Sequence, residues 1–161
     1  MQVVSGRLDY PTVHFEAPPR EGLEKRLQEF IDWFNNSLTD LRLDPLLRAG
    51  ITHLWFVTLH PFDDGNGRIT RTLTDLALAQ MDEQSIRLYA ISPAILNKRK
   101  SYYDILEQTQ NNDSNITNWL VWFLDTLNDS LETTLKQINR TLFKSQFWHK
   151  YFNLEKKKKK K

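Results

Sequence analysis

The sequence contains no cysteine, no long apolar run and no leader-like N-terminus. Without cysteine there is no disulfide framework and no thiolate metal site. No apolar stretch approaches the roughly 20 residues that a membrane-spanning helix needs. Residues 1–20 also lack the basic and then apolar layout of a signal peptide. We therefore expect a cytoplasmic protein that makes no contact with a membrane.

Positive charge is scarcer than the formal net charge of +2 suggests. Six of the 22 basic residues form the terminal run Lys156–Lys161, which follows Leu154 and Glu155 and looks like an added tail. Without Glu155 and these lysines the body has 16 basic and 19 acidic residues, a net charge of −3. A mildly acidic body gives no support for DNA binding. If the run is native, the alternative is a solvated basic tail that touches anionic surfaces.

The amino-acid composition, with 40% hydrophobic residues, is typical of a globular protein. We expect one domain over residues 1–153 and a tail over residues 154–161. Short β-prone runs at about residues 3–16 predict a small hairpin. Apolar residues then recur at three- and four-residue spacing and predict helices at 21–36, 44–60, 65–81 and 92–110, and a long one from about 117. The expected fold class is mainly α, a helical bundle with an N-terminal β-hairpin.

Some helix boundaries have specific signals. Asp44 followed by Pro45, and Ser92 followed by Pro93, each predict an N-cap with proline at the first helical position. Thr117 or a neighbour is expected to cap the last helix. The segment 131–147 is amphipathic, and completion of the core is the favoured interpretation of its apolar face. The alternative is packing on a neighbouring domain or subunit.

Residues 60–71, His-Pro-Phe-Asp-Asp-Gly-Asn-Gly-Arg-Ile-Thr-Arg, carry the chemistry. A Gly-x-Gly stretch that enters a helix turns backbone N–H groups toward one point, where the helix dipole adds positive potential. Arg68 and Arg71 lie three residues apart on one helical face and can each form paired hydrogen bonds to phosphate oxygens. The residues predicted to bind phosphate are Gly65, Asn66, Gly67, Arg68 and Arg71.

Two further residues of this segment are predicted to take part in catalysis. A carboxylate at Asp64, beside a polyphosphate, is favourable when a cation lies between them, and Mg²⁺ is commonly held by one or two carboxylates together with substrate phosphates. His60 is suited to accept a proton from a hydroxyl. Phe62 is expected to point into the core and hold the loop in place.

Each part of this segment also has an ordinary structural interpretation. Asp-Gly and Asn-Gly are common turn signals, and a single histidine after an apolar run is usually a core or cap residue. His14, His53 and His149 are interpreted in that way, as structural or exposed. The functional interpretation of residues 60–71 depends on all parts occurring in one order, which has a chance probability on the order of 10⁻⁸ at average residue frequencies.

That order resembles the signature of the Fic family, H-x-F-x-[D/E]-G-N-G-R-x-x-R, at every defined position, and the resemblance extends over about residues 5–128. It implies a protein adenylyltransferase that moves AMP from ATP to a Ser, Thr or Tyr hydroxyl of a target protein. The resemblance assigns the base to His60, the Mg²⁺ ligand to Asp64 and the anion hole to the Gly-Asn-Gly backbone with the Asn66 side chain. It places the β-phosphate at Arg68 and the γ-phosphate at Arg71.

The same resemblance makes the N-terminal hairpin a flap that docks the target protein by main-chain pairing. It places adenine against the helix that carries Tyr103, Leu106 and Gln110. Many Fic proteins are restrained by a helix with the pattern [S/T]-x-x-x-E-[G/N], whose Glu pairs with the second motif arginine. No such pattern occurs in residues 1–161. Three alternatives are open: an inhibitory helix upstream of Met1, one in a separate protein, or none at all. We expect a core domain without its N-terminal inhibitory region, in which Arg71 has no glutamate partner.

Other functions remain open at this point. The same fold can move UMP or a phosphoryl group, or remove AMP. Another class is a catalytically idle module that binds nucleotide and a partner, although such a module has no need for His60. A DNA-binding helical domain is a third class, which the acidic body disfavours.

Overall fold

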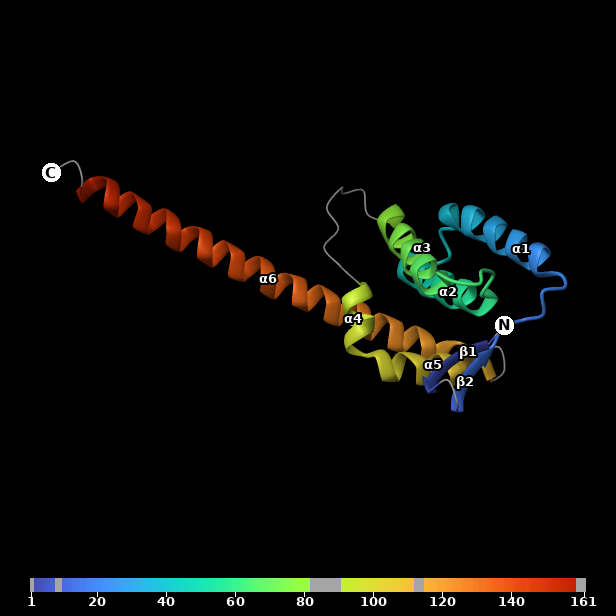
Figure 1. Cartoon of the computed structure of the whole chain (residues 1–161). Coiled ribbons are helices and arrows are strands. Elements are labelled where there is room, and N and C mark those ends of the chain that lie inside the picture. The colour runs from blue at the N-terminus through green and yellow to red at the C-terminus, as the bar shows by residue number, and fades with distance from the viewer. Residues whose placement is uncertain (1, 8–9, 82–90, 112–114, 159–161) are drawn as a thin grey trace.

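A computed structural model describes residues 2–7, 10–81, 91–111 and 115–158 of the chain. Helices dominate these ranges, which confirms the mainly helical fold class. The helices are α1 (Leu23–Asn36), a short 3₁₀ turn η1 (Ser37–Thr39), α2 (Pro45–Leu59), α3 (Asn66–Met81), α4 (Ile91–Asn97), α5 (Arg99–Asn111) and α6 (Thr117–Lys158). In Figure 1 they form one body from which the distal part of α6 extends.

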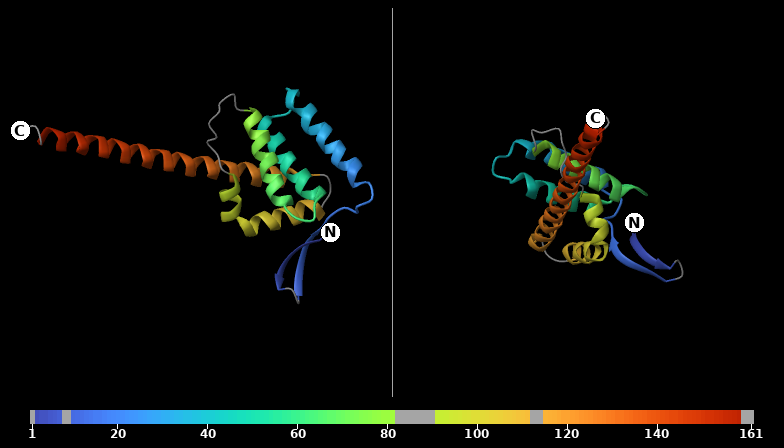
Figure 2. Two further views of the ribbon diagram at one scale, coloured as in Figure 1. Left: turned by 45° about the horizontal axis from the view of Figure 1, so that its top comes forward. Right: turned by 90° about the vertical axis from the view of Figure 1, so that its left-hand side faces the viewer.

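Two antiparallel strands precede the helices, β1 (Gln2–Arg7) and β2 (Tyr10–Glu16). They pair from Gln2 opposite Glu16 to Arg7 opposite Tyr10, with a register shift between Val3 and Val4. β2 contacts α5, and the ribbon lies at the side of the body near that helix (Figures 1 and 2).

Helix α2 begins as the sequence predicts, with Asp44 as its N-cap and Pro45 at its first position. The Asp44 side chain accepts hydrogen bonds from the backbone N–H groups of Leu46, at 2.8 Å, and Leu47. Two backbone donors that the helix itself leaves unpaired are thereby satisfied. This fixed start matters because the other end of α2 carries His60.

Helices α2 and α6 pack closely against each other in the core. The fully buried Trp119 donates its indole N–H to the carbonyl of Gly50 at 2.8 Å. A Cβ built on Gly50 would lie 3.0 Å from Leu120 Cδ2 and 3.1 Å from Phe123 Cδ1. The two helices therefore approach more closely than a larger residue at position 50 would allow, which fixes α2 rigidly beneath the site.

The prediction of one helix over 92–110 is wrong, because the chain bends at Lys98 between α4 and α5. Lys98 N–H still donates to the carbonyls of Ala94 and Ile95, at 3.2 and 3.1 Å, and its carbonyl accepts from Tyr102 N–H. The apolar spacing continues through the bend since both helices face one core, so the spacing does not reveal it. Ser92 is also not an N-cap, because α4 already includes Ile91.

Helix α6 contradicts the expectation that residues 131–147 complete the core. Trp119, Phe123 and Leu127 are buried, but every residue over 135–152 is exposed. Both views of Figure 2 show this part of α6 leaving the body. At its start, Asn115 Oδ1 accepts from Thr117 N–H at 3.0 Å, so a neighbour of Thr117 provides the cap. None of the described helices, α6 included, is both long and apolar enough to cross a bilayer.

Candidate active site

The loop between α2 and α3 is shaped by its two ends. His60 ends α2 in a left-handed conformation, with φ 45° and ψ 54°, and its N–H still donates to the carbonyl of Phe56 at 3.2 Å. This conformation is uncommon for a residue with a side chain, and such strain is often found at functional sites. The reversal at His60 turns the chain toward α3, so that the ring lies at the entrance of the motif loop.

Asn66 holds the loop closed with its side chain. Its Oδ1 accepts from Phe62 N–H at 3.0 Å and its Nδ2 donates to the Phe62 carbonyl, and Asn66 is buried. The Asn66 amide thus uses its oxygen and one of its two N–H donors within the loop. The backbone N–H groups of the first turn of α3, which have no partner within the helix, lie at the same point and suit an anion.

Phe62 does not point into the core as predicted. It is 45% exposed, and its ring centroid lies 6.4 Å from that of Phe56. The reason is that the Phe62 backbone, rather than its ring, is the anchored part, since its N–H donates to Asn66 Oδ1 and its carbonyl accepts from Asn66 Nδ2. The aromatic ring therefore forms part of the surface beside the loop.

Arg68 and Asp64 form an ion pair at the N-terminus of α3. Arg68 Nη2 lies 3.0 Å from Asp64 Oδ2, and the two side chains are 74% and 92% exposed. Asp64 Oδ1 also accepts from Gly65 N–H at 2.6 Å. An exposed pair of this kind contributes little stability. Both members can therefore exchange partners at low cost, Arg68 for a phosphate and Asp64 for a cation.

Asp64 suits a magnesium site that is formed by one carboxylate together with substrate phosphates. Within the described ranges, no three His, Cys, Asp or Glu side chains gather as a metal cluster. A site built by protein side chains alone is therefore not present among these residues. Mg²⁺ keeps several waters and is usually held by one or two carboxylates together with substrate phosphates. One exposed carboxylate next to a helix N-terminus is compatible with that arrangement.

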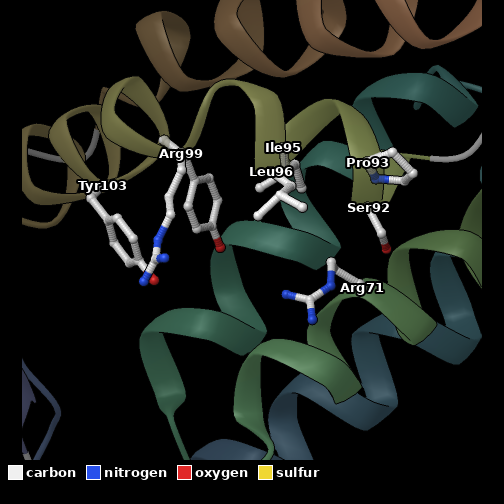
Figure 3. Close-up of a pocket in the computed structure, with 8 residues that line it drawn as sticks. Arg71, Ser92, Pro93, Ile95, Leu96, Arg99 and Tyr103 are labelled. Atoms are coloured by element: carbon white, nitrogen blue, oxygen red, sulfur yellow. The ribbon is translucent and has the colours of Figure 1, made fainter.

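Arg71 lines a cavity of about 470 Å³ between α3 and the α4–α5 pair. Figure 3 shows Arg71 below Ser92 and Leu96 of α4, with Arg99 and Tyr103 close together on α5 to one side. Among the described residues Arg71 forms no ion pair with a carboxylate. The cavity volume is within the usual range for small-molecule sites. Its lining comprises Arg71, Ser92, Pro93, Ile95, Leu96, Arg99, Tyr102 and Tyr103.

The three residues predicted to hold adenine have different positions. Tyr103 lines the cavity, and the Arg99 guanidinium lies 5.8 Å from its ring centroid. Leu106 is only 6% exposed, packs in the core and is not among the residues that line this cavity. Gln110 is not among the lining residues and donates to Thr58 Oγ1 at 2.9 Å. Sequence reasoning missed Arg99, although it precedes Tyr103 by one helical turn.

His60 has the electrostatics of a base rather than of a surface histidine. Burial lowers the pKa of His60 below its ordinary value of 6.5, and the Val57 carbonyl opposes this shift. Its Nδ1 is buried and makes no hydrogen bond of acceptable geometry with the rest of the described structure. A lowered pKa keeps the ring neutral near pH 7, and only the neutral ring can accept a proton.

Gly65 is required by its backbone conformation, which gives a first prediction. Its φ is +86°, and a side chain there costs about 1–2 kcal/mol. We expect Gly65→Ala to lower the free energy of unfolding by about that amount, measured by urea denaturation. Gly67→Ala is the matched control, because its Cβ would meet only the flexible end of Arg71, at 3.3 Å. Equal losses in the two variants would contradict the prediction.

Known proteins resemble this chain over the same region. Residues 4–78 match the model of the Fic/DOC family. The chain is 38% identical over 79 residues to the protein adenylyltransferase fic-1 of Caenorhabditis elegans, covering 47% of this chain and 15% of that protein. It is 33% identical over 98 residues to the protein adenylyltransferase Fic of Nematostella vectensis, covering 60% and 21%. The chain thus spans about a fifth or less of these relatives.

A solved structure shows the same fold. It is a Fic family protein from Desulfovibrio desulfuricans G20, which matches 80% of this chain and 37% of its own with a TM-score of 0.65 at 24% identity. At that identity the likeness shows the architecture of the helices and leaves the chemistry to the residues of the loop.

Proposed function

We propose that this chain, whose residues 4–78 match the model of the Fic/DOC family, is a Mg²⁺-dependent protein adenylyltransferase that transfers AMP from ATP to a Ser, Thr or Tyr hydroxyl of a target protein. One observation carries the proposal. The loop over residues 60–71 brings a partly buried, unpaired histidine, a helix N-terminus and two arginines together at the junction of α2 and α3. The relatives named as adenylyltransferases support the choice of AMP as the transferred group.

The transfer is a single displacement at the α-phosphorus of ATP. Neutral His60 accepts the proton of the target hydroxyl, and the hydroxyl oxygen forms a bond to the α-phosphorus. The bond from that phosphorus to the bridging oxygen breaks, and pyrophosphate leaves with the electron pair. The pKa of His60, lowered by burial, allows this role at neutral pH. When bound, Mg²⁺ would neutralise phosphate charge beside Asp64.

The chain's own cations hold the triphosphate. Arg68 releases Asp64 and turns to a phosphate oxygen, where a charge-assisted pair is stronger than the exposed ion pair it replaces. The first N–H groups of α3 bind the same anion. Arg71 meets the terminal phosphate from the other side of the helix N-terminus, and Tyr103 offers an aromatic face to the base in the adjoining cavity.

Two further features of the proposal concern proteins rather than nucleotide. A target segment would pair with an edge of the β1–β2 ribbon, since extended peptides add to exposed strands by main-chain hydrogen bonds. An inhibitory helix would present a glutamate to Arg71, which has no acidic partner among the described residues.

Labelled ATP tests the reaction. With Mg²⁺ present, we expect label from the α-phosphate to become covalently attached to the protein itself or to proteins of a lysate. Label from the γ-phosphate should not transfer, because it leaves with pyrophosphate. Removal of Mg²⁺ by a chelator should stop the labelling. Transfer of γ-label would indicate a phosphotransferase, and label from UTP alone would indicate UMP transfer. Either result would contradict the proposal.

A further inference from the structure

The cavity between α3 and the α4–α5 pair is lined by a second arginine, which lies outside the motif loop. Arg71 lines it from α3 and Arg99 from α5, and none of the described lining residues is acidic. In Figure 3 the guanidinium of Arg71 points toward the side of the cavity on which Arg99 lies. Much of the remaining lining is apolar, through Pro93, Ile95 and Leu96. A cleft with charges of one sign and apolar walls concentrates their field and attracts a ligand of the opposite sign.

Arg99 is the first residue of α5, and its neighbours along the chain do not neutralise its charge. The positions three and four residues away on either side are Ile95, Leu96, Tyr102 and Tyr103. None of these carries a charge at neutral pH. The Arg99 guanidinium carbon lies 5.8 Å from the ring centroid of Tyr103. Such a cation–π contact restrains the guanidinium without using its N–H donors, which are the groups that bind phosphate oxygens in pairs.

Two guanidinium groups on separate helices suit an anion with more than one phosphate group. Each planar guanidinium forms parallel hydrogen bonds to the oxygens of one phosphate. A pyrophosphate unit offers such oxygens on two phosphorus atoms, so that Arg71 and Arg99 can each bind one phosphate. A single phosphate or carboxylate group has fewer oxygens to share between them. The pair of arginines therefore favours the two terminal phosphates of a nucleoside triphosphate.

The place of the cavity beside α3 agrees with the path of the nucleotide in the proposed function. There the α-phosphorus lies beside His60, at the N-terminus of α3 that also carries Arg68. Arg71 is about one helical turn further along α3 and lines the cavity. The phosphates beyond the α-phosphorus therefore lead from the motif loop to the cavity, where Arg99 is the second cation.

We propose that Arg99 is a binding residue for the terminal phosphates of ATP, which it holds together with Arg71, so that this cavity selects a nucleoside triphosphate. The inference rests on the proposed function for the identity of the nucleotide. The pyrophosphate that AMP transfer releases contains the same two phosphates, so the same pair of arginines binds it until it leaves. Tyr103 then has two roles, because one face of its ring holds Arg99 and the other can take the base.

Ligand binding to the purified chain in the presence of Mg²⁺ tests Arg99 without a target protein. Titration calorimetry with ATP, AMP and inorganic pyrophosphate separates the terminal phosphates from the rest of the nucleotide. We expect Arg99→Gln to raise the Kd for ATP and for pyrophosphate by roughly tenfold or more, the effect of one lost hydrogen-bonded charge. The Kd for AMP should change by less than about twofold, because AMP lacks the phosphates that Arg99 binds.

Lys100→Gln is the matched control, because it removes the same charge from the next residue, which is exposed and does not line the cavity. All three Kd values should stay within about twofold of those of the native chain, since salt screens an exposed charge that makes no direct contact. An equal rise for ATP and AMP in Arg99→Gln would assign Arg99 to the base instead of the phosphates. An equal rise for ATP in both variants would show a general effect of charge. Either result, or unchanged ATP binding by Arg99→Gln, would overturn the proposal.

Transfer assays keep this proposal separate from the proposed function. Weaker binding of ATP and pyrophosphate by Arg99→Gln, in a chain whose native form transfers no label from the α-phosphate, would support the phosphate site and contradict AMP transfer. AMP transfer by the native chain, with the same KM for ATP in Arg99→Gln, would support the proposed function and overturn the role of Arg99.

Discussion

Replacing His60 by alanine is expected to lower the rate of AMP transfer by about 10²–10⁴-fold, the usual contribution of a general base. The ring is the one proton acceptor in the motif loop that burial keeps largely neutral near pH 7. Without it the target hydroxyl must lose its proton to water. The measurement is the initial rate of covalent labelling from ATP that carries label in the α-phosphate.

The same variant separates chemistry from binding. Because His60 lies beside the helix N-terminus and not within it, ATP affinity should change by less than about threefold while the rate falls. His149→Ala is the control, since His149 is exposed on distal α6. Transfer by the native chain should also decline as the pH falls through a pKa below 6.5, the direction in which burial shifts His60. Unaltered labelling by His60→Ala would exclude His60 as the base.

The chemistry of the loop could be predicted from the sequence because it depends on residues that are adjacent in the chain. Spacing alone places His60, Asp64 and Arg68 around one turn and one helix N-terminus, and the structure brings them there. The spacing of residues in the sequence does not show which partners a side chain will hydrogen-bond. Asn66 has an amide that suits an anion, yet Phe62 offers it two backbone partners at closer range.

The pocket was harder to predict because it depends on contacts between distant segments. Tyr103 and Leu106 lie on the same helix, and only the packing of α5 against the other helices decides that Tyr103 lines the cavity while Leu106 packs in the core. The apolar face of distal α6 was misinterpreted for a related reason. The spacing of Leu131, Leu135, Ile138 and Leu142 gives an apolar face, and only the packing of the body shows that its own core does not cover this face.

Below the pocket, His53 is buried in a network that fixes its protonation. The Thr74 hydroxyl donates to the Thr70 carbonyl at 2.8 Å, so it must accept from His53 Nδ1–H at 2.9 Å. His53 Nε2 then accepts from the Tyr102 hydroxyl at 3.0 Å. The tautomer is thereby determined, and no position is left for a second proton. Burial, together with the charge of Arg71, lowers the pKa of His53 to about 3.

This lowered pKa predicts a fold that loses stability in mild acid. The unfolded chain binds a proton at His53 below about pH 6.5, whereas the folded chain does not bind it until about pH 3. The contribution of neutral His53 to the free energy of unfolding is therefore fully present above about pH 6.5. It is lost as the pH falls toward 3, at about 1.4 kcal/mol per pH unit. Between about pH 7 and pH 5, this single site should lower the free energy of unfolding by about 2 kcal/mol.

Urea denaturation of matched variants isolates that contribution from the carboxylates, which titrate in every form of the chain. His53→Gln cannot take up the proton, so its free energy of unfolding should fall less between the two pH values, by about 2 kcal/mol. His149→Gln is the control and should keep the full pH dependence, since His149 is exposed on distal α6 and takes no part in this network. This part of the pH dependence of the free energy of unfolding can be assigned to His53 only if it is absent in His53→Gln. The same slope in His53→Gln as in the native chain would show that the buried ring is already protonated, and would also contradict the tautomer set by Thr74.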